Sequence, residues 1–521
     1  MNLNDFIRYN VAQYPQKVAT IFRDVRRTHQ EFGTRVNKLS NALLSLDVYK
    51  GDRIAILALN RPEYMEVYWG AWGIGGVVVP LNSRFVGPEA AFVINNSGAN
   101  TVIVQAELIK TIDSVRNELR GVKNFICLGD NGEGYLNYEE LISAGASAET
   151  GIPVTEDDLA FIGYTSGTTG RPKGAMITQK NIISMVSYQL ADLPRKPEDV
   201  GMVLFPFFHI GVTPLFAQIV RPLTCVFSDY EPNNVARLVE QEKITNLVIT
   251  ATQLRMFVNH PDVQKYDLSS IKSVVTGGGF TSPQTARKLF ELIPQVVLDS
   301  VYGMTENTAH LCSKMIYRET LAAEEERMSA LAARAGVRPS GLTAGKPMYG
   351  VQARLVDDKD NEVGVNKIGE VACYGNTVMK GYWRLPQESA DALRGGWFHT
   401  GDLGICTEDG EYFVVDRKKD MILSGDENIY PAEVEEVIAT HPDVVEVAVI
   451  GVPDEKWGEA AKAIVVLREG SKVTEEEIRQ HCQDKIARYK IPKSVAFVAQ
   501  LPRNPAGKVI KGILREKHIE S

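Results

Sequence analysis

The sequence is poor in cysteine and shows no pairing pattern among the cysteines it has. Six occur among 521 residues, widely separated along the chain: Cys127, Cys225, Cys312, Cys373, Cys406 and Cys482. Disulfide frameworks and zinc sites of the Cys-x-x-Cys kind require close, regular spacing. The sequence therefore indicates neither a disulfide-stabilised protein nor a zinc protein of this kind.

The chain also lacks an excess of positive charge. It has 65 acidic and 57 basic residues, a net charge of -8, and no basic tract. Proteins that bind nucleic acid present basic patches or stripes, so we expect no nucleic-acid partner. An anionic substrate must then be held by a local site, because the field of the whole protein does not attract it.

Targeting signals are missing as well. The first residues, Met1 to Asp5, contain no basic segment followed by an apolar one, so no secretory signal is expected. The last residues, His518 to Ser521, do not form the Ser-Lys-Leu peroxisomal signal. We therefore expect a cytoplasmic protein, and the sequence is compatible with a homodimer.

One long segment lacks charge altogether. Residues Gly201 to Val220 contain no Asp, Glu, Lys or Arg, and such a length could cross a bilayer. However, Pro206 and Pro214 would each interrupt the hydrogen bonds of a spanning helix. We expect a buried strand and helix here and no transmembrane segment.

The chain is too long for one hydrophobic core, so two or more domains are expected. Between residues 50 and 300 short apolar runs alternate with amphipathic ones, which is typical of layered α/β structure with largely parallel sheets. The predicted strands are 54–57, 77–79, 101–104, 125–128 and 246–249, and the predicted helices 62–73, 233–242 and 282–292.

The character of the sequence changes in its last third. Short strands with Gly and Asp turns over 352–415 predict a β-rich subdomain, and an α+β unit begins after Lys419. In that unit Thr474 should cap a helix that continues to about Ala487. We predict an α/β fold with a large N-terminal domain, 1–418, and a small mobile C-terminal domain, 419–521. A surface helix is expected over 319–335.

Residues 164–174 carry the most chemistry. The run lies between the expected strand 159–163 and a helix expected from Thr178. Its hydroxyl groups, glycine backbone and lysine can bind phosphate oxygens. The residues concerned are Thr165, Ser166, Gly167, Thr168, Thr169, Gly170 and Lys173. It is not a P-loop of the Walker type, because Gly174 follows Lys173.

This run closely resembles the phosphate-binding motif of the adenylate-forming superfamily, which includes acyl-CoA synthetases, aryl-CoA ligases, luciferases and peptide-synthetase adenylation domains. Four further matches follow in the family's order: 302–306, 397–402, 416–420 and 502–508. Together they span roughly 350 residues, which makes a chance match negligible. The resemblance implies a large domain followed by a small mobile one.

The resemblance also implies roles for individual residues in attack of a carboxylate on the α-phosphate of ATP. Glu306 corresponds to the family's Mg²⁺ ligand, Thr305 to an α-phosphate contact, and Lys508 to the catalytic lysine of the C-terminal loop. The expected nucleotide contacts also include Gly277, Gly278, Gly279, Tyr302, Gly303, Met304, Asp402 and Arg417.

Transfer to coenzyme A requires a second surface at the same site. In the family the small domain rotates about a hinge residue, which is Lys419 here, so that another loop replaces the catalytic lysine. Gly425 corresponds to the glycine that lines the pantetheine channel. Asp426 occupies a position where such ligases commonly have a second glycine. The sequence therefore does not predict how fast the transfer to coenzyme A is.

The acid pocket is less well defined. His209 lies in a segment similar to the family's pocket mouth, where it could contact the carboxylate or be an ordinary core histidine. Because no carboxylate occurs between Gly201 and Val220, an amino-acid substrate is disfavoured. We expect an acyl-CoA synthetase for a hydrophobic acid, with a medium- or long-chain fatty acid as the preferred substrate. An aryl-CoA ligase, a non-catalytic nucleotide-binding relative and a luciferase-type oxidase are the alternatives.

Overall fold

The computed structural model describes residues 1–130, 133–165, 172–192, 195–337, 339, 341–424, 427–454, 457–483, 485–503 and 509–518. Contacts divide the chain into two compact units. The first comprises Met1–Leu321, Lys346–Ala353 and Cys373–Phe398, and the second comprises Ala322–Gly345, Arg354–Ala372 and His399–Ser521. The predicted domain boundary at 418/419 stays a prediction.

The first unit contains a seven-stranded sheet with the order β7-β6-β5-β3-β4-β8-β9. Neighbouring strands are parallel, apart from the antiparallel pair β8–β9. The strands are β3 (Arg53–Leu57), β4 (Val77–Pro80), β5 (Thr101–Gln105), β6 (Asn124–Leu128), β7 (Leu136–Asn137), β8 (Leu159–Thr165) and β9 (Lys173–Thr178). The helices around it are α2 (His29–Ser45), α3 (Pro62–Trp72), α4 (Gly87–Ser97), α5 (Ile109–Asp113) and α6 (Tyr138–Ala144).

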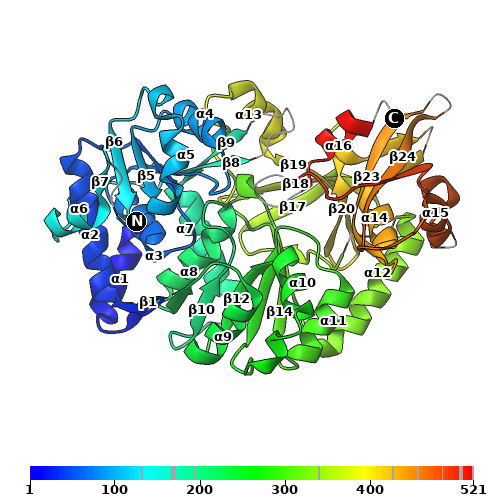
Figure 1. The fold of residues 1–521 in the computed structure, drawn as a ribbon, viewed down its shortest axis with the longest axis horizontal. Coiled ribbons are helices and arrows are strands. Elements are labelled where there is room, and N and C mark those ends of the chain that lie inside the picture. The colour runs from blue at the N-terminus through cyan, green and yellow to red at the C-terminus, as the bar shows by residue number, and fades with distance from the viewer. Residues whose placement is uncertain are drawn as a thin grey trace. The chain divides into compact units, whose positions relative to one another are not determined.

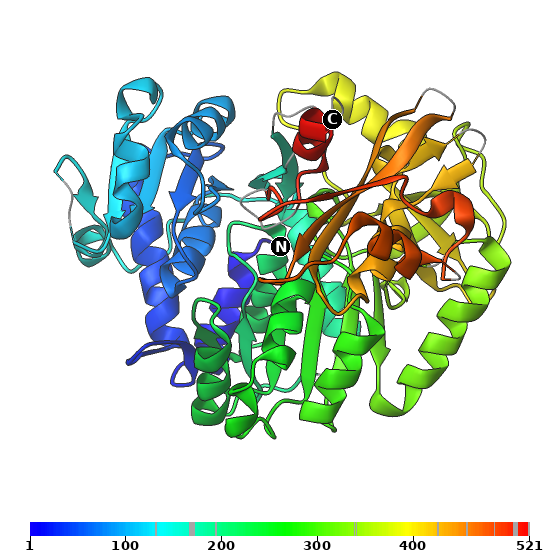
Figure 2. The same ribbon diagram turned by 45° about the vertical axis from the view of Figure 1, so that its right-hand side comes forward.

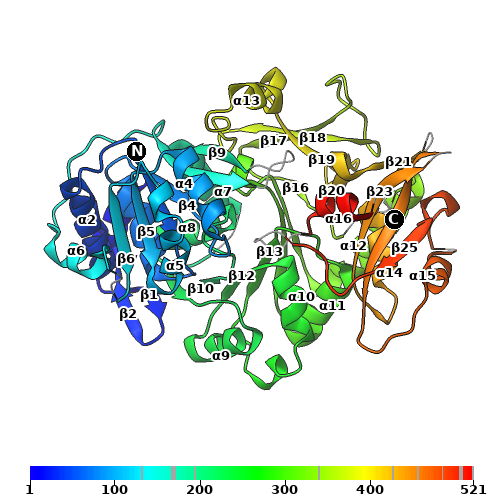
Figure 3. The ribbon, with the colours of Figure 1, turned by 45° about the horizontal axis from the view of Figure 1, so that its top comes forward.

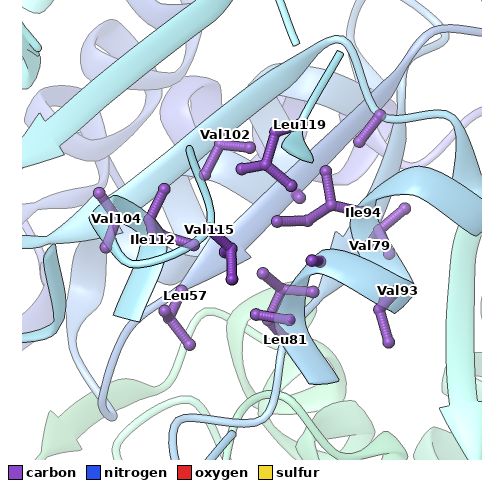
Figure 4. Close-up of a cluster of buried hydrophobic side chains, with 14 of the residues drawn as sticks. Leu57, Val79, Leu81, Val93, Ile94, Val102, Val104, Ile112, Val115 and Leu119 are labelled. Carbon is purple, nitrogen blue, oxygen red and sulfur yellow. The ribbon is translucent and has the colours of Figure 1, made fainter. Parts of the chain in front are cut away.

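The core of this sheet is apolar. Val102 and Val104 of β5 belong to the same buried cluster as Val93 and Ile94 of α4, and all four are fully buried (Figure 4). Figure 3 shows α4 and α5 together on one face of the sheet. The apolar runs predicted as strands 54–57, 77–79, 101–104 and 125–128 are thus confirmed, because runs buried on both faces are what parallel strands require.

The same unit holds a nine-stranded sheet with the order β16-β15-β14-β13-β12-β10-β11-β1-β2. Its central pairs, from β14 to β1, are parallel, and the pairs at both edges are antiparallel. The strands are β1 (Val18–Phe22), β2 (Val25–Thr28), β10 (Val200–Val203), β11 (Thr224–Phe227), β12 (Asn246–Thr250), β13 (Ser273–Gly277), β14 (Val297–Tyr302), β15 (Cys312–Ile316) and β16 (Lys346–Pro347).

Helices connect and cover this second sheet, with α9, α10 and α11 beside β10, β12 and β14 in Figure 1. The helices are α1 (Asn4–Gln13), α7 (Gln179–Asp192), α8 (Thr213–Val220), α9 (Pro232–Glu242), α10 (Ala251–Asn259) and α11 (Pro283–Leu292). Proline at the start of α9 and α11, and the Ser282 side chain that caps α11, explain where these two helices begin.

The uncharged segment after Val200 is a buried strand and helix, as predicted. Every residue of α8 is buried, and Phe216 packs edge-on against Tyr68, Trp69 and Trp72 of α3. Among the described residues no helix is long and apolar enough to span a membrane. The segment 201–220 is therefore apolar because it packs in the core, where α8 contacts α3.

Four strands form a small sheet in the order β17-β18-β19-β20: β17 (Val351–Val356), β18 (Ile368–Gly375), β19 (Phe398–Cys406) and β20 (Tyr412–Arg417). This confirms the predicted β-rich stretch, which is interrupted by α13 (Pro386–Ala392). The predicted surface helix is α12 (Leu321–Ala335), and it ends at Gly336 with φ 69°. Arg327 of α12 pairs with Asp409 at 2.6 Å and with Glu411 at 3.3 Å.

The C-terminal part has a five-stranded sheet in which β22, β21, β24 and β23 follow one another and β25 pairs with β24. Its elements are β21 (Ile422–Ser424), β22 (Glu427–Ile429), β23 (Val444–Asp454), β24 (Gly458–Leu467), β25 (Ser494–Phe497), α14 (Pro431–Ala439), α15 (Glu475–Cys482) and α16 (Lys511–His518). Figure 2 shows β23 and β24 as the long orange strands. Alternate residues of β23 face two cores, with Val449 packing toward α14 and Ile450 toward Leu514 of α16.

Short 3-10 turns complete the description: η1 (Ala106–Leu108), η2 (Arg116–Glu118), η3 (Ile210–Val212), η4 (Val263–Lys265), η5 (Thr305–Asn307), η6 (Arg318–Thr320), η7 (Arg394–Gly396), η8 (Lys418–Asp420) and η9 (Arg488–Lys490).

Two sequence predictions were wrong in detail. The helix capped by Thr474 ends at Cys482, not near Ala487, because Gln483 takes an extended conformation and Ile486 returns to the core. The phosphate-binding run does not lead from a strand into a helix: β9 follows it and pairs antiparallel with β8. The β-branched and apolar residues after Gly174 extend that hairpin before α7 begins at Gln179.

Candidate active site

Three groups of predicted site residues in the first unit lie at one edge of the nine-stranded sheet. The parallel strands β10, β12, β13 and β14 end at Val203, Thr250, Gly277 and Tyr302. His209 follows β10, the glycines 277–279 end β13, and residues 302–306 end and follow β14. The carboxyl edge of a parallel sheet is where α/β folds place their ligands.

The Glu306 carboxylate is held in a fixed position. Glu306 lies on η5 and is buried, and its Oε1 accepts hydrogen bonds from Tyr382 Oη at 3.0 Å and Thr165 Oγ1 at 3.4 Å. The Met379 amide donates to the Glu306 carbonyl at 2.8 Å. Three segments of the chain therefore meet at this carboxylate. Thr305 beside it is also buried.

The turn that carries Thr305 and Glu306 is strained. Thr308 has φ 54° and Ala309 has φ 70°, a region that a β-branched residue rarely occupies. A Cβ on Gly303 would lie 2.1 Å from the Ala309 carbonyl oxygen, so the turn closes only over glycine. The Met304 amide donates to Asn307 Oδ1 at 2.8 Å. Strain of this kind is retained where surrounding contacts hold a functional geometry.

His209 lies against an aromatic ring at the same edge. Its ring stacks on Phe205 with centroids 6.4 Å apart, and its Nδ1 accepts from the Gly211 amide at 3.0 Å. Gly278 has φ 72°, and a Cβ there would lie 3.3 Å from the Phe205 ring. Glycine at 278 thus suits both the backbone turn and the close approach of this ring. A Cβ on Gly279 would make only an ordinary contact, 3.7 Å from Ala251.

The hairpin β8–β9 brings the ends of the phosphate-binding run near this group. Thr165 is the last residue of β8 and Lys173 the first of β9, and the two are paired across the hairpin. Lys173 Nζ lies 5.4 Å from the centre of the Tyr382 ring, a cation–π distance. The predicted contacts Ser166, Gly167, Thr168, Thr169 and Gly170 lie outside the described residues.

The second unit holds the remaining described residues of the predicted site. Asp402 of β19 is paired with Arg417 of β20, and Arg417 Nε lies 2.6 Å from Asp402 Oδ1. Lys419 lies on η8, where burial lowers the pKa of its ammonium group. Arg515 of α16 holds Asp420 at 3.0 Å. Gly425, Asp426 and Lys508 lie outside the described residues.

Comparison with known proteins decides the family. A family model described as AMP-binding enzyme matches residues 7–383, and one described as AMP-binding enzyme C-terminal domain matches residues 433–508. The chain belongs to the AMP-binding enzyme family. It resembles the members of this family over nearly its whole length.

Two curated relatives illustrate the similarity. A long-chain fatty-acid–CoA ligase of Mycobacterium tuberculosis is 33% identical over 500 residues, covering 95% of this chain and 94% of the relative. A feruloyl-CoA synthase of Amycolatopsis is 34% identical over 493 residues, covering 94% of each. The solved structure of an anthranilate CoA ligase in complex with anthranoyl-AMP superimposes with a TM-score of 0.87 at 26% identity, covering 99% and 97% of the two chains.

Family and relatives together establish the reaction class: this chain is an AMP-forming acid–CoA ligase. The predicted fold class is confirmed as well, with a large N-terminal domain of several sheets and a small C-terminal domain. The relatives include both fatty-acid and aryl-CoA ligases, so they do not select one acid.

The residues present suit a magnesium ion that arrives with ATP. In the part of the chain that the structure describes, no three His, Cys, Asp or Glu side chains gather as a metal site. Mg²⁺ in nucleotide-binding enzymes is held by one or two carboxylates together with phosphates and water. Glu306, with the hydroxyl oxygens of Thr165 and Tyr382 beside it, fits that donor set.

Sequence reasoning missed Tyr382 and Phe205. Tyr382 donates to Glu306 from 76 residues away, and it lies in a Gly-Tyr-Trp run that has no spacing relation to the other motifs. Phe205 lies four residues before His209, directly before the segment that resembles the family's pocket mouth, and the pattern gave Phe205 itself no role beyond a buried core residue. Only the folded chain brings these rings to the site.

Proposed function

We propose that this ligase activates a hydrophobic monocarboxylic acid, with medium- or long-chain fatty acids as the preferred class. The supporting observation is the apolar segment after Val200: residues 201–220 contain no charged side chain, and all of α8 is buried. A buried ammonium group would need a carboxylate partner, so the segment suits an uncharged acyl body.

The proposed reaction has two steps. A carboxylate oxygen attacks the α-phosphorus of ATP, forming acyl-AMP and releasing pyrophosphate. The coenzyme A thiol, on losing its proton, then attacks the acyl carbon, forming the thioester and releasing AMP.

The first step brings a carboxylate against a polyphosphate, so cationic groups and oriented donors must offset the charge. In the proposal Mg²⁺ supplies part of this positive charge when it is bound, and Glu306 holds it. Thr305 donates to the α-phosphate. Lys508 bridges the carboxylate and the α-phosphate, and His209 orients the acid at the pocket mouth.

The nucleotide is assigned to the two sets of contacts described above. The glycines at the end of β13 lie against the base, the residues from Tyr302 to Met304 line its other side, and Asp402 accepts from the ribose hydroxyls beside Arg417. Thr165 to Gly170 and Lys173 hold the β- and γ-phosphates. All of these assignments extend the family resemblance to matched positions.

For the second step we propose rotation of the C-terminal domain about Lys419. Rotation withdraws Lys508 and brings the loop with Gly425 to the site, where the absence of a side chain leaves room for pantetheine. The cytoplasm, where ATP and coenzyme A are available, is the proposed location of the enzyme.

A second candidate is an aryl-CoA ligase for cinnamate-like or benzoate-like acids. It is favoured by the 34% identity to a feruloyl-CoA synthase, which is close to the 33% identity to the fatty-acid ligase. Pyrophosphate release should be measured over both series of acids, with and without coenzyme A. If the pocket takes a fatty acid, KM should fall from hexanoate to decanoate. The reason is that each newly buried methylene adds ~0.8 kcal/mol of binding free energy. A flat series with strong turnover of cinnamate would select the aryl-CoA ligase.

A further inference from the structure

A buried carboxylate on β18 links the two strands that carry Asp402 and Arg417. Glu370 is the third residue of β18 and is 5% exposed. Its Oε1 accepts a hydrogen bond from the Gly401 amide of β19 at 3.1 Å, and its Oε2 accepts from Lys418 Nζ, directly after β20, at 3.1 Å. A buried charge is tolerated when it is paired and hydrogen-bonded. Each oxygen of Glu370 therefore binds a different segment of the chain.

The backbone of β19 is kinked directly before Asp402. Gly401 has φ 70°, which is the left-handed region that glycine occupies without steric cost. A Cβ there would meet nothing within 4 Å, so the backbone conformation and not the space selects glycine. Thr400 Oγ1 donates to the Val371 carbonyl at 2.8 Å and accepts from the Asp402 amide at 3.1 Å. Glu370 and Val371, which are neighbours on β18, therefore hold this kink together.

The kink sets the position of the Asp402 carboxylate. Asp402 is buried, and its Oδ1 lies 2.6 Å from Arg417 Nε. An ionised carboxylate has about four acceptor positions, so Asp402 can bind Arg417 and also accept from hydroxyl groups. A binding group has to be held within ~0.5 Å of its working position, and hydrogen bonds from surrounding residues do this. Without an acceptor for the Gly401 amide, the peptide before Asp402 would lose that support.

Lys418 holds the Glu370 carboxylate from the other side. It also pairs with Asp358 at 2.8 Å, but the Asp358 side chain is 88% exposed, whereas that of Glu370 is 6% exposed. An exposed ion pair contributes little, because water screens it. His399 Nδ1 lies 3.7 Å from Glu370 Oε2 as well. Removal of the Asp358 charge should therefore leave Glu370 in place, which makes Asp358 a matched control position.

We propose that Glu370 is a positioning residue for the nucleotide: it accepts the hydrogen bond of the Gly401 amide and thereby aims the Asp402 carboxylate at the ribose hydroxyls of ATP. The inference rests on the proposed assignment of Asp402 to the ribose and adds the residue that holds it in place. Glu370 acts only through the backbone of β19. The length of its side chain should therefore matter more than its charge, since an amide oxygen can accept the same hydrogen bond.

The test measures the dissociation constants of the full-length enzyme for ATP and for 2′,3′-dideoxyATP, each with Mg²⁺ and without an acid, by titration calorimetry. Because the dideoxy nucleotide lacks both ribose hydroxyls, the wild-type enzyme should bind ATP ~10-fold or more tightly. Asp402→Ala should bring this ratio close to one. Glu370→Asp keeps the charge but draws the carboxylate back by one methylene, so the ratio should fall toward that of Asp402→Ala. Glu370→Gln keeps the length of the side chain and should keep a ratio close to the wild-type value, as should Asp358→Asn.

The ratio separates positioning from folding, because a misfolded fraction lowers the number of binding sites and leaves both dissociation constants unchanged. An unchanged ratio in Glu370→Asp would overturn the inference. A loss in Glu370→Gln as large as that in Glu370→Asp would overturn it as well, because it would assign the effect to the charge. A wild-type ratio near one, or an unchanged ratio in Asp402→Ala, would instead refute the ribose assignment on which the inference rests. Since no acid is present, none of these results depends on which acid the enzyme activates.

Discussion

The two large sheets of the first unit have similar architecture and contribute to the candidate site in different ways. Both are mainly parallel and covered by helices. In the seven-stranded sheet the buried polar side chain of Gln105 is satisfied, because its Oε1 accepts from the Leu59 amide at 2.9 Å. In the nine-stranded sheet the buried Asp299 Oδ1 has no hydrogen-bond partner within the described residues, and the same holds for Tyr64 Oη and Trp69 Nε1 of α3 beside the seven-stranded sheet. What separates the two sheets is their part in the site: the seven-stranded sheet contributes its last hairpin, whereas the nine-stranded sheet contributes its carboxyl edge.

The largest effect on catalysis is expected from Lys508, a residue of the C-terminal part of the chain that belongs to neither of these two sheets. Lys508→Ala should lower the single-turnover rate of acyl-adenylate formation by ~10²–10³, because a charge-stabilising donor is lost. Binding of ATP should change little, since most of the assigned nucleotide contacts lie elsewhere. Lys517→Ala, which removes an exposed lysine near the same end of the chain, is the matched control. Near-native adenylation by the Lys508 variant would remove this lysine from the mechanism.

A core substitution in the seven-stranded sheet should affect stability and spare catalysis. Ile94→Ala opens a cavity in the apolar cluster and should destabilise the protein by ~2–5 kcal/mol. Thermal unfolding should begin at a lower temperature, while kcat of the folded enzyme at low temperature stays near the wild-type value. A large loss of kcat at unchanged stability would mean that this sheet takes part in the chemistry.

The opposite pattern is expected at the carboxyl edge of the nine-stranded sheet. Glu306→Gln keeps the size of the side chain and removes the charge proposed to hold Mg²⁺, so the rate should fall by ~10². The midpoint of thermal unfolding should remain close to that of the wild type. The requirement for Mg²⁺ should shift to higher concentration, and an unchanged magnesium dependence would contradict the proposed role of Glu306.

Tyr382→Phe should have the smallest effect of the four. It removes one hydrogen bond to the Glu306 carboxylate, 3.0 Å long, and leaves the ring that faces Lys173. A hydrogen bond to a charged group contributes ~1.5–3 kcal/mol. Because Thr165 still donates to the same oxygen, we expect the low end of this range, a loss of roughly 10-fold in kcat/KM. A loss as large as that of Glu306→Gln would show that the tyrosine acts directly on substrate.

The sequence predicted the fold where local patterns determine it. The run Ile54 to Leu57 is apolar throughout and forms the buried strand β3, and the Ser282–Pro283 pair marks the start of α11. It failed where distant segments decide the outcome. Pairing of β1 with β11 joins residues about 200 positions apart, and the chain after Cys482 turns to return Ile486 to its core.

The candidate site was predictable to the extent that motifs mark it. The resemblance placed Glu306 and His209, which the folded chain brings to one edge of a sheet. Nothing in the pattern pointed to Tyr382, or to the pairing of Glu370 with Lys418, which are 48 positions apart in the sequence. Buried polar residues that meet across elements have no periodicity, so their juxtaposition is visible only in three dimensions.

The most direct test of the account separates the two half-reactions. The enzyme is supplied with ATP, Mg²⁺ and a good acid substrate, acyl-adenylate and pyrophosphate are quantified, and coenzyme A is then added. The account predicts about one pyrophosphate and one acyl-AMP per active site before the thiol is present, followed by thioester and AMP in equal amounts. In Gly425→Leu the first step should proceed near the native rate and the second very slowly, because the side chain fills space needed by pantetheine. Release of ADP and phosphate, or thioester formation without an acyl-AMP intermediate, would contradict the account.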